Sequence, residues 1–390
     1  MKLAIVVVLV ACSGKAKPPK RDDAGVRAAD AGAGDAATSA WPELANLPTV
    51  EPVRVIALPA RPDVPRFTVG GPVLAGDVAI VSSSQFGFIA VDFRRGQIAW
   101  SKPAGAHVAP PQLLDGNAVL LGDCLNEPHV ADGETLLACM RVVTPTGADV
   151  AYLAVHGKTK AVADFAASAG EQHLDKTETG LVWRRGDHAV AIDPMTGVAT
   201  PAPAIEPPLV VTYKDKTWRI RRGDDGVISA EGKPAWHSEP NHDTLLGAVN
   251  IPQQSPLVRV SRAVRHRERP ELLLFDVDAT GSLNWQVSTS PAPGIGLIGH
   301  AIDPVGDVAL AVRLDTSLER DYIAAYAANA RLLWTYQLPR MPRPDPVGIA
   351  IANDAVVVFH DGDTFTVLPE LSAPPTAPAA VKAPSENATP

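Results

Sequence analysis

The chain has 390 residues, of which 46% are hydrophobic and 20% are charged, and its net charge is −8. This length exceeds that of most single domains but suits one closed β architecture. The negative net charge argues against nucleic acid as a partner, because binding to phosphates requires a basic surface.

The first residues have the pattern of a secretion signal. Lys2 precedes nine apolar residues, Leu3–Ala11, a run too short to cross a bilayer as a helix. Leu9–Cys12 resembles the lipobox of bacterial lipoproteins, in which the signal is removed before the cysteine and Cys12 would carry acyl chains. An ordinary signal peptide with an incidental cysteine is the alternative. In enteric lipoproteins an aspartate directly after the cysteine is the signal that keeps the lipoprotein from reaching the outer membrane. This chain has Ser13 at that position, which favours the outer membrane.

A segment rich in Ala, Gly, Asp and Pro follows the cysteine and has few large apolar side chains, so we expect a disordered tether. Its average reach is roughly 30–36 Å. A Pro/Ala-rich end has the same character. The predicted organisation is a signal peptide at 1–11, the lipidated cysteine and tether at 12–48, a folded domain at 49–371 and a disordered tail at 372–390.

The body of the chain repeats one pattern, in which two hydrophobic strands meet at a tight turn and a tryptophan closes the unit. The pattern is clearest at Leu272–Trp285, and it recurs before Trp100, Trp236 and Trp334. Its turn positions are spaced by 51, 50, 35, 49 and 49 residues, at Gly96, Gly147, Gly197, Gly232, Gly281 and Ala330. A period of this size in a strand-rich pattern predicts a β-propeller, and we expect the tryptophans to pack between its blades.

The predicted fold class is therefore all-β, with a single propeller. Seven repeat units can be delimited, so we predict seven blades, with six to eight open. The strand Glu51–Leu58 precedes the first complete unit. We expect it to complete the last blade, which closes the circle and covers an open sheet edge.

Two cysteines, Cys124 and Cys139, lie on the two legs of a long hairpin in the second unit. Because Cys12 is assigned to lipid, an even pair is left in an oxidising compartment, and we predict a disulfide between them. Closing a loop of this length stabilises by about 3 kcal/mol in the chain-entropy model. Two buried free thiols are the alternative.

Other motifs have structural explanations. Pro293–Gly299 contains G-x-G-x-x-G, but prolines precede it and strand-like residues follow it, unlike a dinucleotide site. Asp276–Gly281 resembles the start of a calcium loop, but Val287 stands where that loop requires glutamate. His242–Asp243 and His360–Asp361 are predicted to be solvated turn residues. We therefore predict no catalytic residue, no metal site and no cofactor.

Three hairpins are lengthened at the same step of the repeat, with predicted tips at Leu125–Thr135, Arg262–Pro270 and Asp315–Asp321. Equivalent steps emerge on one face of a propeller, and loops on a rigid scaffold often bind partners. The predicted binding face combines a basic tip with acidic ones: Arg262, Arg265, His266, Arg267 and Arg269 against Glu127, Asp132, Glu134, Asp315, Glu319 and Asp321. Tolerated surface insertions are the alternative.

The repeat resembles the quinoprotein-type (PQQ-like) repeat family. The residues that carry the resemblance, within Gly71–Leu368, are Ala90–Asp92 with Trp100, Ala191–Asp193 with Thr196–Gly197, and Phe275–Gly281 with Trp285. In this family the pyrroloquinoline-quinone dehydrogenases commonly have a disulfide between adjacent cysteines, a pair that this chain lacks. The lipobox, tether and repeats together resemble the propeller lipoproteins of the outer-membrane β-barrel assembly machinery, which act by binding.

These resemblances imply a lipid-anchored, non-catalytic protein that binds or scaffolds other envelope components, either proteins or cell-wall material. The implied location is the outer membrane, facing the periplasm or the cell surface. A quinoprotein-like dehydrogenase or redox module is one alternative. A carbohydrate-binding or carbohydrate-cleaving propeller is another, although aromatic residues make up only 5% of the chain.

Overall fold

The computed structural model describes residues 47–375 with internal gaps. The gaps are residues 60–67, 84–85, 106–107, 127, 171, 178–179, 205–208, 214–215, 223–227, 231–232, 237–242, 250–256, 266–269, 279–285, 288–291, 294–295, 304–305, 316–319, 330 and 340–346. The described residues all belong to one compact unit, Asn46–Pro390. The predicted signal peptide, Cys12, nearly all of the tether and most of the tail lie outside the described residues, so the predicted boundaries stay predictions.

The described residues form antiparallel sheets, which we number along the chain. The first sheet contains β2 (Thr68–Ala75), β3 (Val78–Ser83), β4 (Gly87–Asp92) and β5 (Gln97–Lys102). The second contains β6 (Gln112–Leu114), β7 (Asn117–Gly122), β8 (Thr135–Val143) and β9 (Asp149–Gly157). The third contains β10 (Gln172–Thr177), β11 (Gly180–Arg185), β12 (His188–Ile192) and β13 (Ala199–Pro201).

The remaining sheets follow the same order of strands. The fourth contains β14 (Leu209–Tyr213), β15 (Lys216–Arg222), β16 (Ile228–Ala230) and β17 (Lys233–Trp236). The fifth contains β18 (Asp243–Val249), β19 (Leu257–Arg265), β20 (Pro270–Asp278), β21 (Gln286–Val287) and β22 (Ala292–Pro293). The sixth contains β23 (Gly296–Ile302), β24 (Val308–Asp315), β25 (Arg320–Tyr326) and β26 (Leu332–Gln337). The seventh contains β27 (Gly348–Ala352), β28 (Ala355–His360), β29 (Thr364–Pro369) and β1 (Arg54–Ala57).

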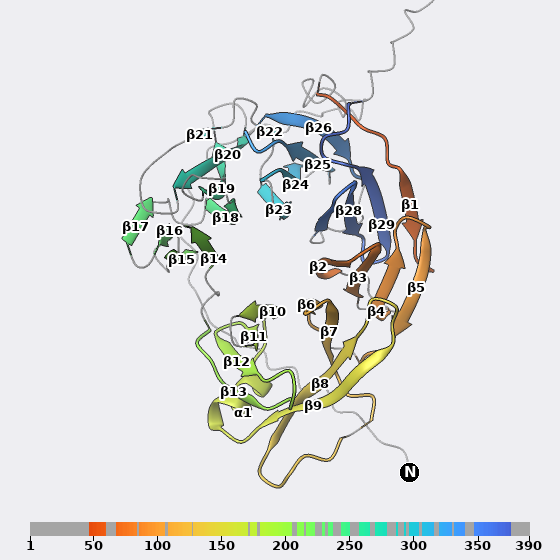
Figure 1. Ribbon diagram of the computed structural model, residues 1–390, viewed down its shortest axis with the longest axis vertical. Helices are drawn as coiled ribbons and strands as arrows, with labels where there is room; N and C mark the ends of the chain where they lie inside the picture. Colours follow the sequence, from red (N-terminus) through yellow and green to blue (C-terminus); the bar gives the residue numbers. More distant parts are fainter. Residues whose placement is uncertain are drawn as a thin grey trace, which may run out of the picture. The chain divides into compact units, whose positions relative to one another are not determined.

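In six pairs of sheets the first strands contact one another. These contacts join β2 to β6, β6 to β10, β14 to β18 and β18 to β23, whose strands are labelled in Figure 1, and also β23 to β27 and β27 to β2. The last contact brings the end of the chain back to its beginning, so the fold is a β-propeller, as the repeat predicts. The described residues form seven sheets. That these are the blades of a seven-bladed ring stays a prediction.

The predicted closing strand takes its place in the last sheet. β1 pairs antiparallel with β29, with Arg54 opposite Val367 (Figure 1). Side chains along β1 alternate, so that Ile56 and Leu58 are buried while Val53 and Val55 are exposed. This alternation is the period of a strand with one buried face. Closure by the N-terminal strand is thus confirmed, and the free edge of β29 is covered.

The first and seventh sheets meet at what we call the closure seam, formed by Gly71, Ser83, Arg94 and their partners in the seventh sheet. A Cβ atom added to Gly348 would lie 2.5 Å from the Cα atom of Gly71, so only glycine permits this approach of the backbones. The Ser83 hydroxyl donates a hydrogen bond to the Gly362 carbonyl at 2.9 Å. Both contacts are made against backbone atoms, so the seam is closed tightly.

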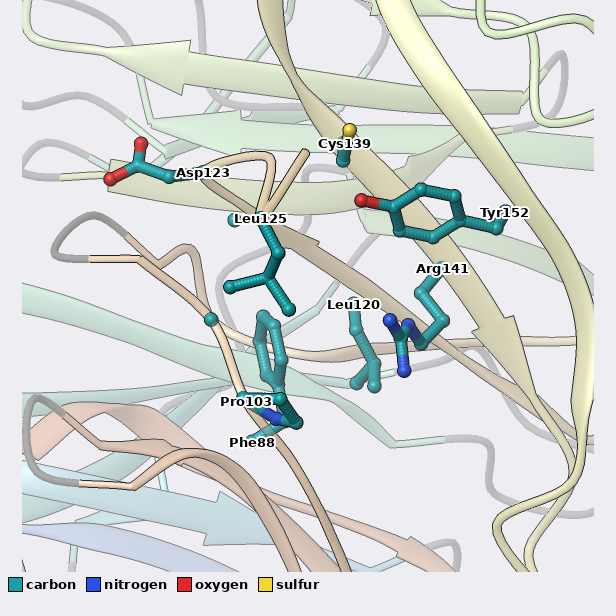
Figure 2. A pocket seen from close by; sticks show the side chains of 10 residues that line it. Phe88, Pro103, Leu120, Asp123, Leu125, Cys139, Arg141 and Tyr152 are labelled. Carbon is teal, nitrogen blue, oxygen red and sulfur yellow. The ribbon is translucent and has the colours of Figure 1, made fainter. Parts of the chain in front are cut away.

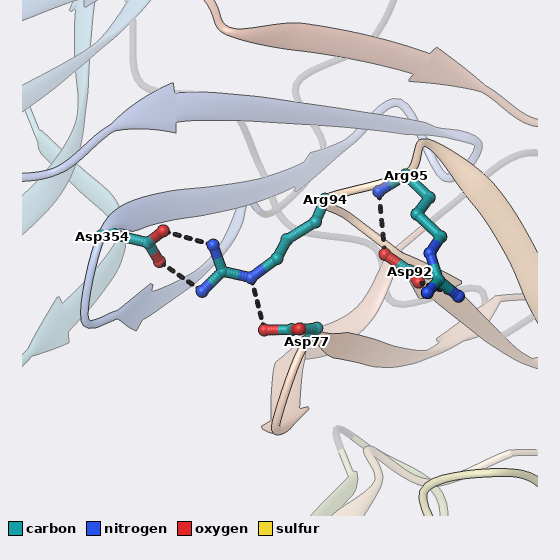
Figure 3. A network of polar contacts seen from close by, with 5 residues as sticks. All are labelled: Asp77, Asp92, Arg94, Arg95 and Asp354. Carbon is teal, nitrogen blue, oxygen red and sulfur yellow. Dashed lines mark hydrogen bonds and ion pairs between the residues drawn. The ribbon is translucent and has the colours of Figure 1, made fainter.

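Arg94 bridges the two sheets at the surface of the seam (Figure 3). Its Nε atom donates to Asp77 Oδ1 at 2.5 Å, and its Nη2 atom donates to Asp354 Oδ1 at 2.9 Å. Hydrogen bonds to Asp77 and then Asp354 raise the pKa of Arg94 above its ordinary value. The guanidinium therefore joins the β2–β3 turn to the β27–β28 turn.

The repeated turns join the third strand of a sheet to the fourth. At the three predicted turn glycines that are described, Gly96, Gly147 and Gly197, the φ angles are 72°, 85° and 75°. Residues other than glycine rarely adopt this backbone conformation. In two of the turns an aspartate caps the backbone: Asp92 accepts from Arg95 N–H and Asp193 from Met195 N–H, each at 2.8 Å.

Two of the predicted tryptophans pack between sheets. Trp100 on β5 donates from its indole N–H to the carbonyl of Pro145 in the next sheet, at 2.9 Å. Trp334 on β26 is fully buried and donates to the Leu371 carbonyl, which follows β29, at 3.0 Å. Each ring fills the space between neighbouring sheets, and its N–H group finds a backbone acceptor.

The helix α1 (Lys160–Ala167) is an addition that the repeat does not predict; the other described elements are strands, so the predicted all-β class is confirmed. It lies in the connection from β9 to β10 and contacts β8, β12 and β13. The Thr159 side chain caps its N-terminus by accepting from Val162 N–H at 3.3 Å. Val162 and Phe165, three residues apart on one helical face, are buried. The strand repeat carries no signal for this helix, because the helix lies in a connection between repeat units.

Candidate functional site

The connection between β7 and β8 is long, and a disulfide fixes its base. Cys124 and Cys139 are bonded to each other, with Cα atoms 4.9 Å apart. Cys139 lies opposite Gly122 in the β7–β8 ladder, while Cys124 lies just beyond the end of β7. The disulfide predicted from the sequence is therefore present, and it closes segment 124–139 near the end of β7, an inner strand of the sheet.

Glu134 holds the returning end of this hairpin against β9. Its Oε2 atom accepts from Ala131 N–H at 3.1 Å and lies 2.8 Å from His156 Nδ1. Lys158 Nζ lies 3.6 Å from Oε1. Burial opposes the charge of Glu134, but the Ala131 N–H, His156 and Lys158 outweigh it, so the pKa of Glu134 is lowered. Glu134 thus serves the hairpin rather than the predicted binding face.

A small hollow opens beside the hairpin, between the first and second sheets, and we call it the hairpin groove (Figure 2). Its volume is about 20 Å³, which is room for roughly one water molecule. Its lining is Phe88, Pro103, Ala104, Leu120, Gly122, Asp123, Leu125, Cys139, Arg141 and Tyr152. Two large apolar residues of this lining are exposed, Leu125 at 48% and Tyr152 at 44%.

Charged groups flank the same groove. The Arg141 guanidinium carbon lies 5.1 Å from the centre of the Tyr152 ring, within the range of a cation–π contact. Lys102 Nζ on β5 lies 3.2 Å from Asp149 Oδ1, and Arg141 Nη1 lies 3.7 Å from the same oxygen. Sequence reasoning missed these residues. The feature of the sequence that could have pointed to them is Arg141, the one charged residue in the otherwise largely apolar strand β8.

The lengthened hairpins do occupy one step of the repeat. The β7–β8, β19–β20 and β24–β25 connections each join the second strand of a sheet to the third. However, Arg262 and Arg265 lie in β19, and Asp315 lies in β24, rather than in loops. Strand pairing continues to Arg265 opposite Pro270 and to Asp315 opposite Arg320, so these two hairpins are lengthened mainly by strand.

The other predicted binding residues are only partly placed. Asp132 is exposed at the tip of the β7–β8 connection. Asp321 is buried and accepts from Arg313 Nε at 3.2 Å, so it is a core ion pair rather than a surface acid. The remaining residues, Glu127, His266, Arg267, Arg269 and Glu319, lie outside the described residues. The structure therefore brings together the two cysteines but leaves the predicted charged face untested.

The prediction of solvated histidine–aspartate turns is wrong for His360, which lies in β28 and is buried. Its Nδ1 atom lies 3.1 Å from Asp361 Oδ2, and its Nε2 atom lies 2.9 Å from Thr366 Oγ1. Both ring nitrogens thus have polar partners inside the seventh sheet. Asp243 likewise lies in a strand, β18, while His242 is outside the described residues.

Two further findings concern the described residues as a group. No helix among them is long and apolar enough to cross a membrane. Nowhere in the described part of the chain do three or more His, Cys, Asp or Glu side chains gather as they would around a metal ion. The predictions of no metal and no cofactor stay predictions.

No family model and no curated protein matches the chain. Solved structures similar to it include the mitotic checkpoint complex, at 12% identity over 89% of this chain and 98% of that one, with a TM-score of 0.48. Quinohemoprotein alcohol dehydrogenase from Comamonas testosteroni has 10% identity over 86% and 79%, with a TM-score of 0.43. BamB from Moraxella catarrhalis has 15% identity over 82% and 100%, with a TM-score of 0.39. At these values the likenesses carry no argument about function.

Proposed function

We propose that the chain is a lipid-anchored, non-catalytic β-propeller that binds other proteins of the bacterial cell envelope through the hairpin groove. The observation that carries the proposal is the pair Leu125 and Tyr152, two large apolar side chains exposed at one hollow. Exposed apolar side chains that gather at one place, with charged groups around them, are typical of protein interaction sites.

The groove is shaped for part of a polypeptide rather than for a free small molecule. Ligand pockets enclose most of a small molecule, whereas a hollow of about 20 Å³ accommodates at most the end of one side chain. The Cys124–Cys139 disulfide fixes the base of the hairpin that carries Leu125. A surface held in place before binding loses less conformational entropy when the partner arrives.

The proposed cellular location rests on the sequence. The lipobox at Leu9–Cys12 supports acylation of Cys12, and Ser13 supports the outer membrane, with the propeller facing the periplasm or the cell surface. The tether would let the propeller reach partners about one domain diameter from the membrane. The β19–β20 and β24–β25 hairpins, at the same step of their sheets, are included as further contact surfaces, with Arg262, Arg265 and Asp315 on them.

Site-specific photocrosslinking in the intact envelope tests the proposal. A benzophenone side chain at Leu125 is expected to form an adduct with an identifiable envelope protein. The same group at Val55, which is exposed on β1, is the matched control and is expected to give none. No adduct at Leu125, or equal adducts at both positions, would refute the function. Separately, Cys12→Ser is expected to move the protein out of the membrane fraction.

A further inference from the structure

We infer that the hairpin groove selects an extended polypeptide segment in which an apolar side chain stands next to a carboxylate. The inference rests on the proposed function and names the chemistry of the partner. It follows from two features of one site, an apolar contact surface and an excess of positive charge beside it.

The apolar half is formed by Leu125 and the residues beneath it. Figure 2 shows Leu125 directed toward Phe88, with the Leu120 side chain between Phe88 and Arg141. Phe88 and Leu120 are buried, so they form a floor, while Leu125 and Tyr152 stay accessible at the rim. An apolar side chain laid across this floor would remove the exposed parts of Leu125 and Tyr152 from water.

The charged half contains two cations for one carboxylate. Lys102 and Arg141 both approach Asp149 Oδ1, at 3.2 and 3.7 Å, and this shared carboxylate neutralises only one of them. The Arg141 contact exceeds hydrogen-bond length, so Asp149 leaves the hydrogen-bonding capacity of the guanidinium largely unused. In Figure 2 the Arg141 guanidinium lies on the groove side, beneath the Tyr152 ring.

The second carboxylate of the lining does not cancel this excess. Burial lowers the pKa of Arg185 in the third sheet, and the charge of Asp123 acts in the opposite direction. Asp123 is therefore near enough to the Arg185 cation for the two charges to interact. The local balance beside Tyr152 stays at one uncompensated positive charge, which favours an anionic group on the partner.

The geometry restricts how that anion arrives. Arg141 is held between the Tyr152 ring, at 5.1 Å, and Asp149, so its planar group is oriented before binding. A carboxylate can meet such a guanidinium through two parallel hydrogen bonds. A partner segment that inserts an apolar side chain beside Leu125 would present the adjacent carboxylate to Arg141.

Peptide binding to the full-length acylated chain in detergent micelles tests the inference. The probes are three fluorescein-labelled nonapeptides with a central Leu-Phe pair, flanked by Glu, by Gln or by Lys. Fluorescence anisotropy is expected to show the tightest binding for the Glu peptide, weaker binding for the Gln peptide and the weakest for the Lys peptide. The Glu peptide should bind about tenfold more tightly than the Gln peptide, as one charge-assisted hydrogen-bonded contact would give.

Arg141→Gln is expected to abolish this preference, and Lys102→Gln to reduce it without touching the tyrosine contact. Arg95→Gln, on the β4–β5 turn, is the matched control and should keep the full preference, and thermal unfolding checks that each variant folds. Equal binding of the three peptides, or a preference unchanged in both groove variants, would overturn the inference. The inference would also fail if added lipid micelles displaced all three peptides from the protein to the same extent. Adducts at Leu125 together with equal peptide binding would remove the inference and leave the proposed function standing.

Discussion

The first sheet meets two neighbours in different ways. At the closure seam its backbone touches that of the seventh sheet at Gly71 and Gly348, and Ser83 bonds to a carbonyl across the interface. At the hairpin groove the first and second sheets leave a small hollow, with Leu125 and Tyr152 exposed in its lining. One face of the sheet thus meets its neighbour through backbone contacts, and the other through a cluster of buried side chains with a small hollow beside it.

The difference follows from what fills each interface. The seam core includes two aromatic rings, Phe359 and Phe365, packed 4.7 Å apart together with residues of β1. The groove side has a smaller cluster around Phe88, Ala90 and Leu120, and the long β7–β8 hairpin lies above it. Closing a ring requires dense packing at the point where the chain ends meet, whereas a neighbouring interface has a covalent connection and can accept an insertion.

Truncating a buried ring on each side is expected to give the largest difference. Phe359→Ala should lower the free energy of unfolding by about 4 kcal/mol, because a cavity at the seam has rigid backbone on both sides. Phe88→Ala should lower the free energy of unfolding by about 1 kcal/mol less than Phe359→Ala, or by a still smaller amount, because its cavity merges with the groove. Urea unfolding of the two variants measures both values. Equal losses would show that the two interfaces are packed alike.

Removing the disulfide tests the groove side alone. Cys124→Ser with Cys139→Ser is expected to lower the free energy of unfolding by about 3 kcal/mol, the chain-entropy value for a loop of 15 residues. Chymotrypsin should then cleave near Leu125 before the propeller unfolds. Reducing the native protein is the matched control and should produce the same cleavage. An unchanged cleavage pattern would mean that the hairpin is held by its other contacts.

Two glycines that face each other across the seam provide a matched pair. A Cβ atom at Gly348 would lie 2.5 Å from Gly71 Cα, whereas one at Gly71 would lie 3.5 Å from Gly348 Cα. Gly348→Ala is therefore expected to destabilise the protein by about 2 kcal/mol, and Gly71→Ala by less than about 1 kcal/mol. Thermal unfolding of both variants distinguishes them. A larger effect at Gly71 would contradict the backbone contact described for the seam.

The smallest expected effect is a response to pH at the groove only. The pKa of Glu134 is lowered below its ordinary value of 4.5 in the folded protein. Its contact with the hairpin is thus fully present above pH 4.5 and is lost as the pH falls through the lowered pKa. Hydrogen exchange at the Ala131 amide, corrected for its intrinsic rate, should therefore lose protection on acidification.

Glu134→Gln should remove this pH dependence, and Asp132→Asn, at the same tip, should leave it in place. As a reference, the Val53 amide donates to the Val367 carbonyl in the seventh sheet at 2.8 Å, and its protection should not follow the same titration. A pH response of equal midpoint at both amides would assign the effect to global unfolding instead.

Much of the fold could be predicted because its signals are local. The turn glycines Gly96, Gly147 and Gly197 mark positions where the backbone must adopt a positive φ, and the spacing between them is the length of one sheet. Cys124 and Cys139 could be paired because few cysteines were available. The helix α1 was missed because it lies in a connection, and Arg262 was misplaced because turn residues do not show where strand pairing stops.

The sequence by itself determined the repeat, the closing strand and the disulfide, since each depends on spacing along the chain or on residue type. Only the tertiary structure decided that Arg141 and Tyr152 line one groove, that Lys102 shares Asp149 with Arg141, and that His360 is buried. Those contacts join different sheets or depend on which face of a strand is covered. Which residues become neighbours there is set by the packing of one sheet on the next, and the order of residues in either strand does not specify it.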